Sequence, residues 1–191
     1  MLAKYLTNRS RLLISTIISF TLAFLGTLIA WNVLSLKLYD ILESLSLFGI
    51  IYSTIPAFTA VLVRPLIGKF VDVFGARNAY TLTMILYLLY FVTLFMASSQ
   101  LFIVLWFIPP FPLLDTAIYT LSASMFPPRM QSSASGLAIT SQGIAGIILV
   151  LINRFPLDYN VVLAIVVTSF ITATIISISI KMRVVSDWVR A

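Results

Sequence analysis

Residues 12–36 read LLISTIISFTLAFLGTLIAWNVLSL, an unbroken run without a charged side chain. A helix of about 20 apolar residues crosses a hydrocarbon core of about 30 Å at about 1.5 Å per residue. The run is longer than the apolar core of a secretory signal peptide, and Ala30-Trp31-Asn32 is a poor cleavage context. It therefore predicts a first transmembrane helix that is retained.

The whole chain of 191 residues shares this character, with 61% hydrophobic and 9% charged residues. Soluble domains carry roughly half apolar and about a quarter charged residues, so the lipid bilayer is the expected surroundings. The absence of histidine and cysteine removes disulfides, thiol nucleophiles and the usual transition-metal sites. We expect no cofactor, no metal and no enzyme activity. The basic residues are scattered between apolar runs, which argues against nucleic-acid binding.

Charged residues and clusters of glycine, proline and serine divide the chain into apolar runs. An uncharged stretch from Asn78 to Leu114 is too long for one crossing, and Ser98-Ser99-Gln100 is the expected turn within it. The sequence therefore predicts an all-α integral membrane protein in which residues 1–191 form one domain. Its six transmembrane helices are expected at about 12–36, 44–63, 78–96, 101–125, 130–153 and 159–180.

Basic residues indicate the direction of these helices, because lysine and arginine are enriched in cytoplasmic loops. If the N-terminus is inside, only Lys37 and Arg154 lie outside. The basic residues then expected inside are Lys4, Arg9, Arg11, Arg64, Lys69, Arg77, Arg129, Lys181, Arg183 and Arg190. This asymmetry predicts a multi-pass protein of the cell membrane with both termini in the cytoplasm.

The expected loop between the second and third helices reads RPLIGKFVDVFGAR over residues 64–77. We expect Gly68 to permit close backbone approach in a short turn, and Gly75 to end a helix with a positive φ. Asp72 is then a carboxylate near the membrane surface among basic residues that include Lys69 and Arg77. Residues 126–129, FPPR, precede the small residues of the fifth helix.

These two stretches resemble the signature loop and the fifth-helix entry of the major facilitator superfamily. The resemblance implies a twelve-helix transporter built from two halves, each a 3+3 inverted repeat around a central site. This chain would supply one half, slightly more like the C-terminal one. Gly68, Asp72, Gly75 and Arg77 would form a cytoplasmic gate, with Asp72 facing the start of the fifth helix.

Asp115 is the outstanding polar residue within the predicted membrane region. Its distance from Gln100 and Pro127 places it near mid-depth, where an ionisable group costs about 2.5 kcal/mol or more. Tyr52 and Gln142 are expected near the same level, whereas Asn32 is expected nearer the outer face. The resemblance implies that the helices carrying these four residues line the central cavity.

Two roles for Asp115 stay open from the sequence: proton coupling or contact with a cationic substrate, and a hydrogen-bonded packing role. The prolines just before it, Pro109, Pro110 and Pro112, are expected to free backbone carbonyls and to create a kink, a gating hinge or a packing feature.

The resulting functional hypothesis is an ion-gradient-driven transporter half that moves a small molecule or ion. Alternating access requires two bundles, so we expect a second six-helix half, either another copy or a separate chain. The alternative is a truncated, transport-inactive membrane subunit with a binding or regulatory role.

Overall fold

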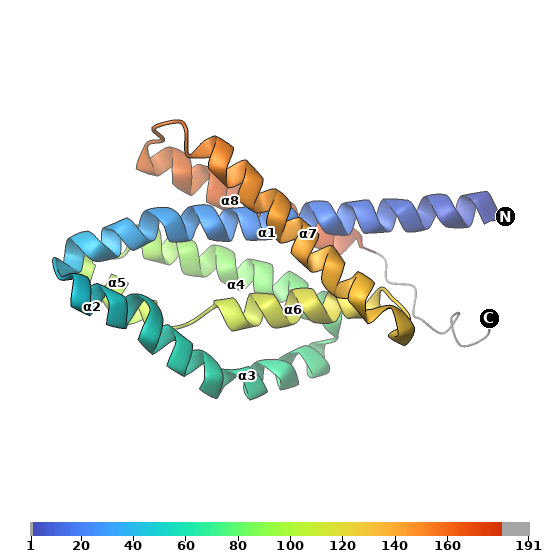
Figure 1. Cartoon of the computed structure of the whole chain (residues 1–191), viewed down its shortest axis with the longest axis horizontal. Coiled ribbons are helices and arrows are strands. Elements are labelled where there is room, and N and C mark those ends of the chain that lie inside the picture. The colour runs from blue at the N-terminus through green and yellow to red at the C-terminus, as the bar shows by residue number, and fades with distance from the viewer. Residues whose placement is uncertain (1, 181–191) are drawn as a thin grey trace.

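A computed structural model describes the backbone of residues 2–180 and the side chains of residues 10–180. All regular elements in this part of the chain are helices. They lie side by side in an elongated bundle (Figure 1). The elements are α1 (Leu2–Leu42), α2 (Leu45–Gly49), η1 (Ile50–Thr54), α3 (Ile55–Phe74), α4 (Ala76–Met96), α5 (Ser99–Trp106), α6 (Phe111–Ser124), η2 (Pro128–Met130), α7 (Gln131–Ile152) and α8 (Tyr159–Ser179).

Within the described residues, five helical stretches are long and apolar enough to cross a membrane. A sixth is formed if α5 and α6, which are bent by 45° at a short break, are counted as one span. The third, fifth and sixth helices end within two residues of their predicted bounds. The described residues therefore hold five candidate spans, or the six expected from the sequence if the bent pair is one span.

The first and second helices run further than predicted. The first continues to Leu42, past the predicted end at residue 36, and the second span continues through α3 to Phe74, past residue 63. Charged residues served as boundaries in the prediction, but the i to i−4 backbone bonds of a helix do not depend on side-chain charge. Lys37 and Arg64 are accordingly helical residues and not loop residues.

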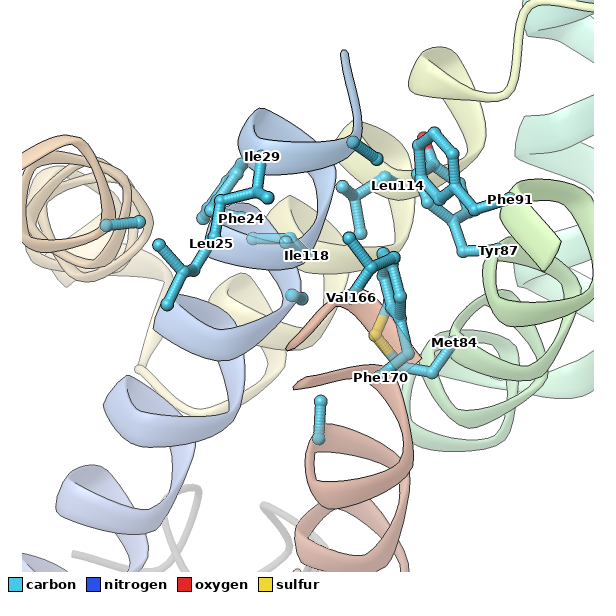
Figure 2. Close-up of a cluster of buried hydrophobic side chains, with 14 of the residues drawn as sticks. Phe24, Leu25, Ile29, Met84, Tyr87, Phe91, Leu114, Ile118, Val166 and Phe170 are labelled. Carbon is cyan, nitrogen blue, oxygen red and sulfur yellow. The ribbon is translucent and has the colours of Figure 1, made fainter. Parts of the chain in front are cut away.

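Two central helices organise the packing. α1 packs against α7 and α8, while α6 packs against α3, α4 and α7, and α4 also packs against α8. Figure 2 shows the junction, where apolar side chains of α1, α4, α6 and α8 meet. In membranes such contacts rest on close van der Waals packing and interhelical hydrogen bonds, because lipid is as apolar as the side chains.

One end of the bundle joins α1, α4 and α8. The Lys37 ammonium donates to the carbonyls of Phe95 and Ala97 at 3.5 and 3.3 Å, and lies 4.8 Å from the centre of the Phe102 ring. The Tyr159 hydroxyl donates to the same Phe95 carbonyl at 2.9 Å. The free carbonyls at the end of α4 are thus satisfied by a cation and a hydroxyl.

At the opposite end of the bundle the roles are exchanged, and a side chain of α4 bonds carbonyls of α8. Arg77, in the first turn of α4, donates to the carbonyl of Ser177 at 3.3 Å and to that of Ile178, at the end of α8. A guanidinium at a helix C-terminus also interacts favourably with the helix dipole. α4 and α8 are therefore antiparallel and fastened to each other at both ends.

These contacts place the start of α1, the α3–α4 and α6–α7 connections and the end of α8 at one end of the bundle (Figure 1). The two termini, Met1 and Ala191, lie outside the described residues. The basic residues Lys181, Arg183 and Arg190 also lie outside them, as do the side chains of Lys4 and Arg9.

Candidate functional site

The fourth span is interrupted between Trp106 and Phe111. Pro109 and Pro110 lie in the break, and Pro112 occupies the first turn of α6, where the missing N–H costs nothing. Of the alternatives left open from the sequence, the structure shows a kink, with α5 and α6 bent by 45°. Pro109 cannot donate to the carbonyl of Leu105, nor Pro112 to that of Ile108, so these groups need other partners.

Tyr90 of α4 supplies one partner for both carbonyls. Its hydroxyl lies 3.3 Å from the Leu105 oxygen and 3.3 Å from the Ile108 oxygen, and it can donate to either. The Leu105 carbonyl also accepts from the Ile108 N–H at 3.0 Å. Broken backbone at membrane depth is tolerated when neighbouring side chains satisfy it in this way. Tyr90 was not singled out from the sequence, because its role depends on a contact between two helices.

Asp115 lies in the second turn of α6, just after the break, and is half-buried. Its carboxyl makes no hydrogen bond or ion pair with the described part of the chain. Two groups interact with it electrostatically from neighbouring helices: the Arg64 guanidinium of α3 and the Tyr87 hydroxyl of α4. A carboxyl in a membrane span therefore interacts with a cation from one neighbouring helix and with a phenol from another.

Arg64 is one of the residues that the sequence prediction placed wrongly. It was assigned to a cytoplasmic loop, yet it lies within the helix from Ile55 to Phe74, with an exposed side chain. The parallel course of α3 and α6, which are alternate spans, brings it to the level of Asp115. In the sequence, the position of Arg64 directly after an apolar run was the only feature that could have indicated this placement.

The other three candidates do not join Asp115. Tyr52 lies near the first end of the second span, not at mid-depth, because that span continues to Phe74. Its ring contacts Trp106, with 5.9 Å between ring centres, on the far side of the break from Asp115. The predicted meeting of Tyr52, Gln142 and Asp115 at one level is therefore wrong for Tyr52.

Gln142 occupies the middle of α7, as expected, and its side chain is exposed. Asn32 lies toward the end of the bundle that holds Lys37. Its amide donates to the side-chain oxygen of Asn153, just after α7, at 3.3 Å. Asn32 therefore links the ends of α1 and α7, and this contact is a helix-to-helix bond within the chain.

The predicted gate residues are partly rearranged. Gly75 has φ 75° and ψ 150° between α3 and α4, which confirms the expected positive φ. Gly68 lies inside α3, and a Cβ there would meet nothing within 4 Å, so the close approach expected in a short turn is wrong. Asp72 is exposed and makes no ion pair within the described residues, while Arg77 is engaged with the end of α8.

Residues 12–185 match the family model described as Major Facilitator Superfamily. The chain belongs to this superfamily. Comparison with the curated proteins and with the solved structures found no match. As a major facilitator chain, it is a multi-pass membrane protein of the transporter type, and members of this superfamily act on small-molecule substrates.

Membership in the major facilitator superfamily gives the described site a physical context. A transporter must expose a polar site to water within the membrane, and an ionisable residue there is costly unless it faces protein or a water-filled cavity. Asp115, with Arg64 and Tyr87 beside it, is the ionisable cluster that the described part of the chain holds inside its spans.

Proposed function

We propose that this chain forms one six-helix half of an ion-gradient-driven major facilitator transporter, in which α3, α6 and α7 line the substrate cavity. The main observation in support of this proposal is that polar side chains are exposed on the spans that flank α6. Arg64 on α3 and Gln142 on α7 are both exposed, and each would be costly against lipid. A water-filled cavity between two bundles accommodates them.

The uneven packing of the helices supports this assignment. In the most apolar part of each span, only 11% of the residues of α2–α3 and 17% of those of α7 are buried, against 56% for α1. α7 packs on the rest of the bundle through Ala134, Ala138 and Ala145, whereas Gly136, Gly143 and Gly146 have open space around them. A second six-helix bundle, another copy or a separate polypeptide, is the proposed partner for this face.

The helix contacts also support a 3+3 inverted repeat. If the first three spans are exchanged with the last three, the pairing of α1 with α7 and α8 becomes the pairing of α6 with α3 and α4. The antiparallel pair of α4 and α8 maps onto itself, including the contacts at its two ends. Such self-mapping is expected of two repeats of opposite orientation.

We assign the cytoplasmic side to the end of the bundle that carries Arg11, Lys69, Arg77 and Arg129, since Lys37 and Arg154 belong to the other end. The plasma membrane is the proposed location. Asp72 lies at the cytoplasmic end with a free carboxylate, and we propose that it acts with Gly68, Gly75 and Arg77 at a gate formed with the second bundle. A photocrosslinker at position 72 that reaches only lipid would contradict the gate.

Single cysteines test the cavity directly, because the chain has none of its own. A membrane-impermeant maleimide, supplied to both faces of the membrane, is expected to label Gln142→Cys and to leave Ile175→Cys unlabelled. Ile175 is an exposed residue of α8, which we assign to the lipid-facing side. A thiol in hydrocarbon does not ionise and reacts slowly. Equal labelling at both positions would contradict the proposed cavity face.

The same reagent tests the assigned orientation of the chain in the membrane. Arg154→Cys should be labelled in intact cells, whereas Arg129→Cys should need permeabilisation, because the two residues lie at opposite ends of α7. The reverse pattern would invert the assigned orientation.

A further inference from the structure

Tyr87 of α4 carries a hydroxyl that the packing does not explain. The residue is 1% exposed, and its ring lies 5.7 Å from the rings of both Phe91 and Phe170. Within the described residues its hydroxyl has no hydrogen-bond partner. Buried polar groups in folded proteins are nearly always paired, so this unpaired hydroxyl calls for an explanation.

The polar groups that interact with this hydroxyl are the carboxyl of Asp115, the hydroxyl of Tyr90 and the backbone of Leu114. Figure 2 shows Tyr87 and Leu114 together at the junction of α4 and α6. The Leu114 N–H already donates to the Pro110 carbonyl at 3.4 Å. Within the described residues the Asp115 carboxyl has no hydrogen-bond partner, so a donor without an acceptor and an acceptor without a donor are carried by two packed helices and interact electrostatically.

The groups around Asp115 come from the three helices packed against α6. α3 contributes Arg64, α4 contributes Tyr87 and Tyr90, and α7 has no ionisable side chain. The Tyr90 hydroxyl is already bonded to the carbonyls at the break. Arg64 is exposed and does not form an ion pair with Asp115 in this structure. Asp115 therefore interacts electrostatically with a buried hydroxyl on α4 and with an exposed cation on α3.

We propose that Tyr87 is the positioning residue for Asp115: its hydroxyl donates a hydrogen bond to the carboxyl when that side chain turns toward α4. When the side chain turns toward α3, the carboxylate pairs with Arg64 instead. The carboxylate takes a proton from water and becomes the neutral acid beside Tyr87. The acid returns that proton to water when it pairs with the guanidinium, and Tyr87 keeps its own proton throughout. Only the coupling of this proton to transport rests on the proposed function.

Infrared difference spectroscopy of the full chain in lipid bilayers tests the inference without a transport assay. During an acid titration, the carbonyl band that Asp115→Asn removes belongs to protonated Asp115. Tyr87→Phe keeps the ring and removes the hydroxyl, so this band should move to higher frequency as the carbonyl loses a donor. The proton affinity of the carboxyl should change about fivefold, as expected for one lost hydrogen bond.

Two variants serve as controls. Tyr80→Phe removes a buried hydroxyl of the same helix that is bonded to Ser19 at 2.9 Å, and should leave the band unchanged. Arg64→Gln should shift the titration midpoint but not the frequency, because Arg64 pairs with the charged form alone. An unchanged band and midpoint in Tyr87→Phe overturns the proposal, and so does the absence of any band that Asp115→Asn removes. A shifted band combined with normal transport in Asp115→Asn would uphold the pairing and overturn the coupling role.

Discussion

Asp115→Asn is expected to abolish gradient-driven accumulation of substrate, down to the level of protein-free vesicles, in chain reconstituted with its partner bundle. Asparagine imitates the neutral acid in shape and hydrogen bonding but can neither release a proton nor pair with Arg64 as an anion. The side chain is half-buried and has no bond to lose within the described residues, so folding should be preserved. The measurement is uptake under an imposed proton gradient, compared with exchange at equilibrium.

Asp158→Asn is the matched control. Asp158 is an exposed carboxylate just before α8, and its side chain caps no backbone group. It should retain wild-type accumulation. If Asp115→Asn accumulates substrate as well as the wild type, Asp115 is a packing residue and the coupling role is wrong.

Gly75→Ala is expected to lower the free energy of unfolding by about 1–3 kcal/mol. With φ 75° and ψ 150°, Gly75 occupies a backbone region that is essentially restricted to glycine, and side chains forced into such regions cost energy of this order. A Cβ at this position would meet nothing within 4 Å, so the cost comes from the backbone and not from a clash. Thermal or denaturant unfolding in detergent measures the change.

Gly68→Ala, in the same motif, is expected to have the opposite effect on stability. Gly68 is a helical residue of α3 with open space at its Cβ, and alanine favours a helix interior by about 0.5–1 kcal/mol relative to glycine. This variant should be as stable as the wild type or more stable. Similar losses in both variants would show that the distinction drawn between the two glycines is wrong.

The spans could be predicted from the sequence because hydrophobic length is a local property. Runs such as residues 159–180 depend only on the thickness of the bilayer, and the helix there ends one residue from its predicted bound. The positive φ of Gly75 was also readable, since a glycine between two apolar runs is the usual way to end a helix.

The site was less predictable because it depends on contacts between helices. Asp115 stood out as the lone acid in an apolar run, but its neighbours Tyr87 and Arg64 are set by the packing of α4 and α3 against α6. Arg64 was misplaced because a charge was used to end a helix that in fact continues to Phe74. Tyr52 was misplaced for the same reason, since the mid-depth of a span depends on both of its ends.

Arg77 shows a further limit of sequence reasoning. Its position in the motif placed it among the basic residues around Asp72, whereas its guanidinium is bonded to carbonyls at the end of α8. The carbonyl acceptors at a helix C-terminus belong to the backbone and not to particular side chains, so this bonding partner of Arg77 could not be predicted from residue types.

Photocrosslinking in native membranes tests whether the face formed by α3, α6 and α7 meets a second six-helix bundle. A cysteine-directed photocrosslinker is placed on Gln142→Cys, with Ile175→Cys as the lipid-facing control, and the products are identified by mass. We expect position 142 to be joined to a second copy of this chain or to another six-helix polypeptide, and position 175 to be joined to lipid. Adducts with lipid alone at both positions would contradict this expectation.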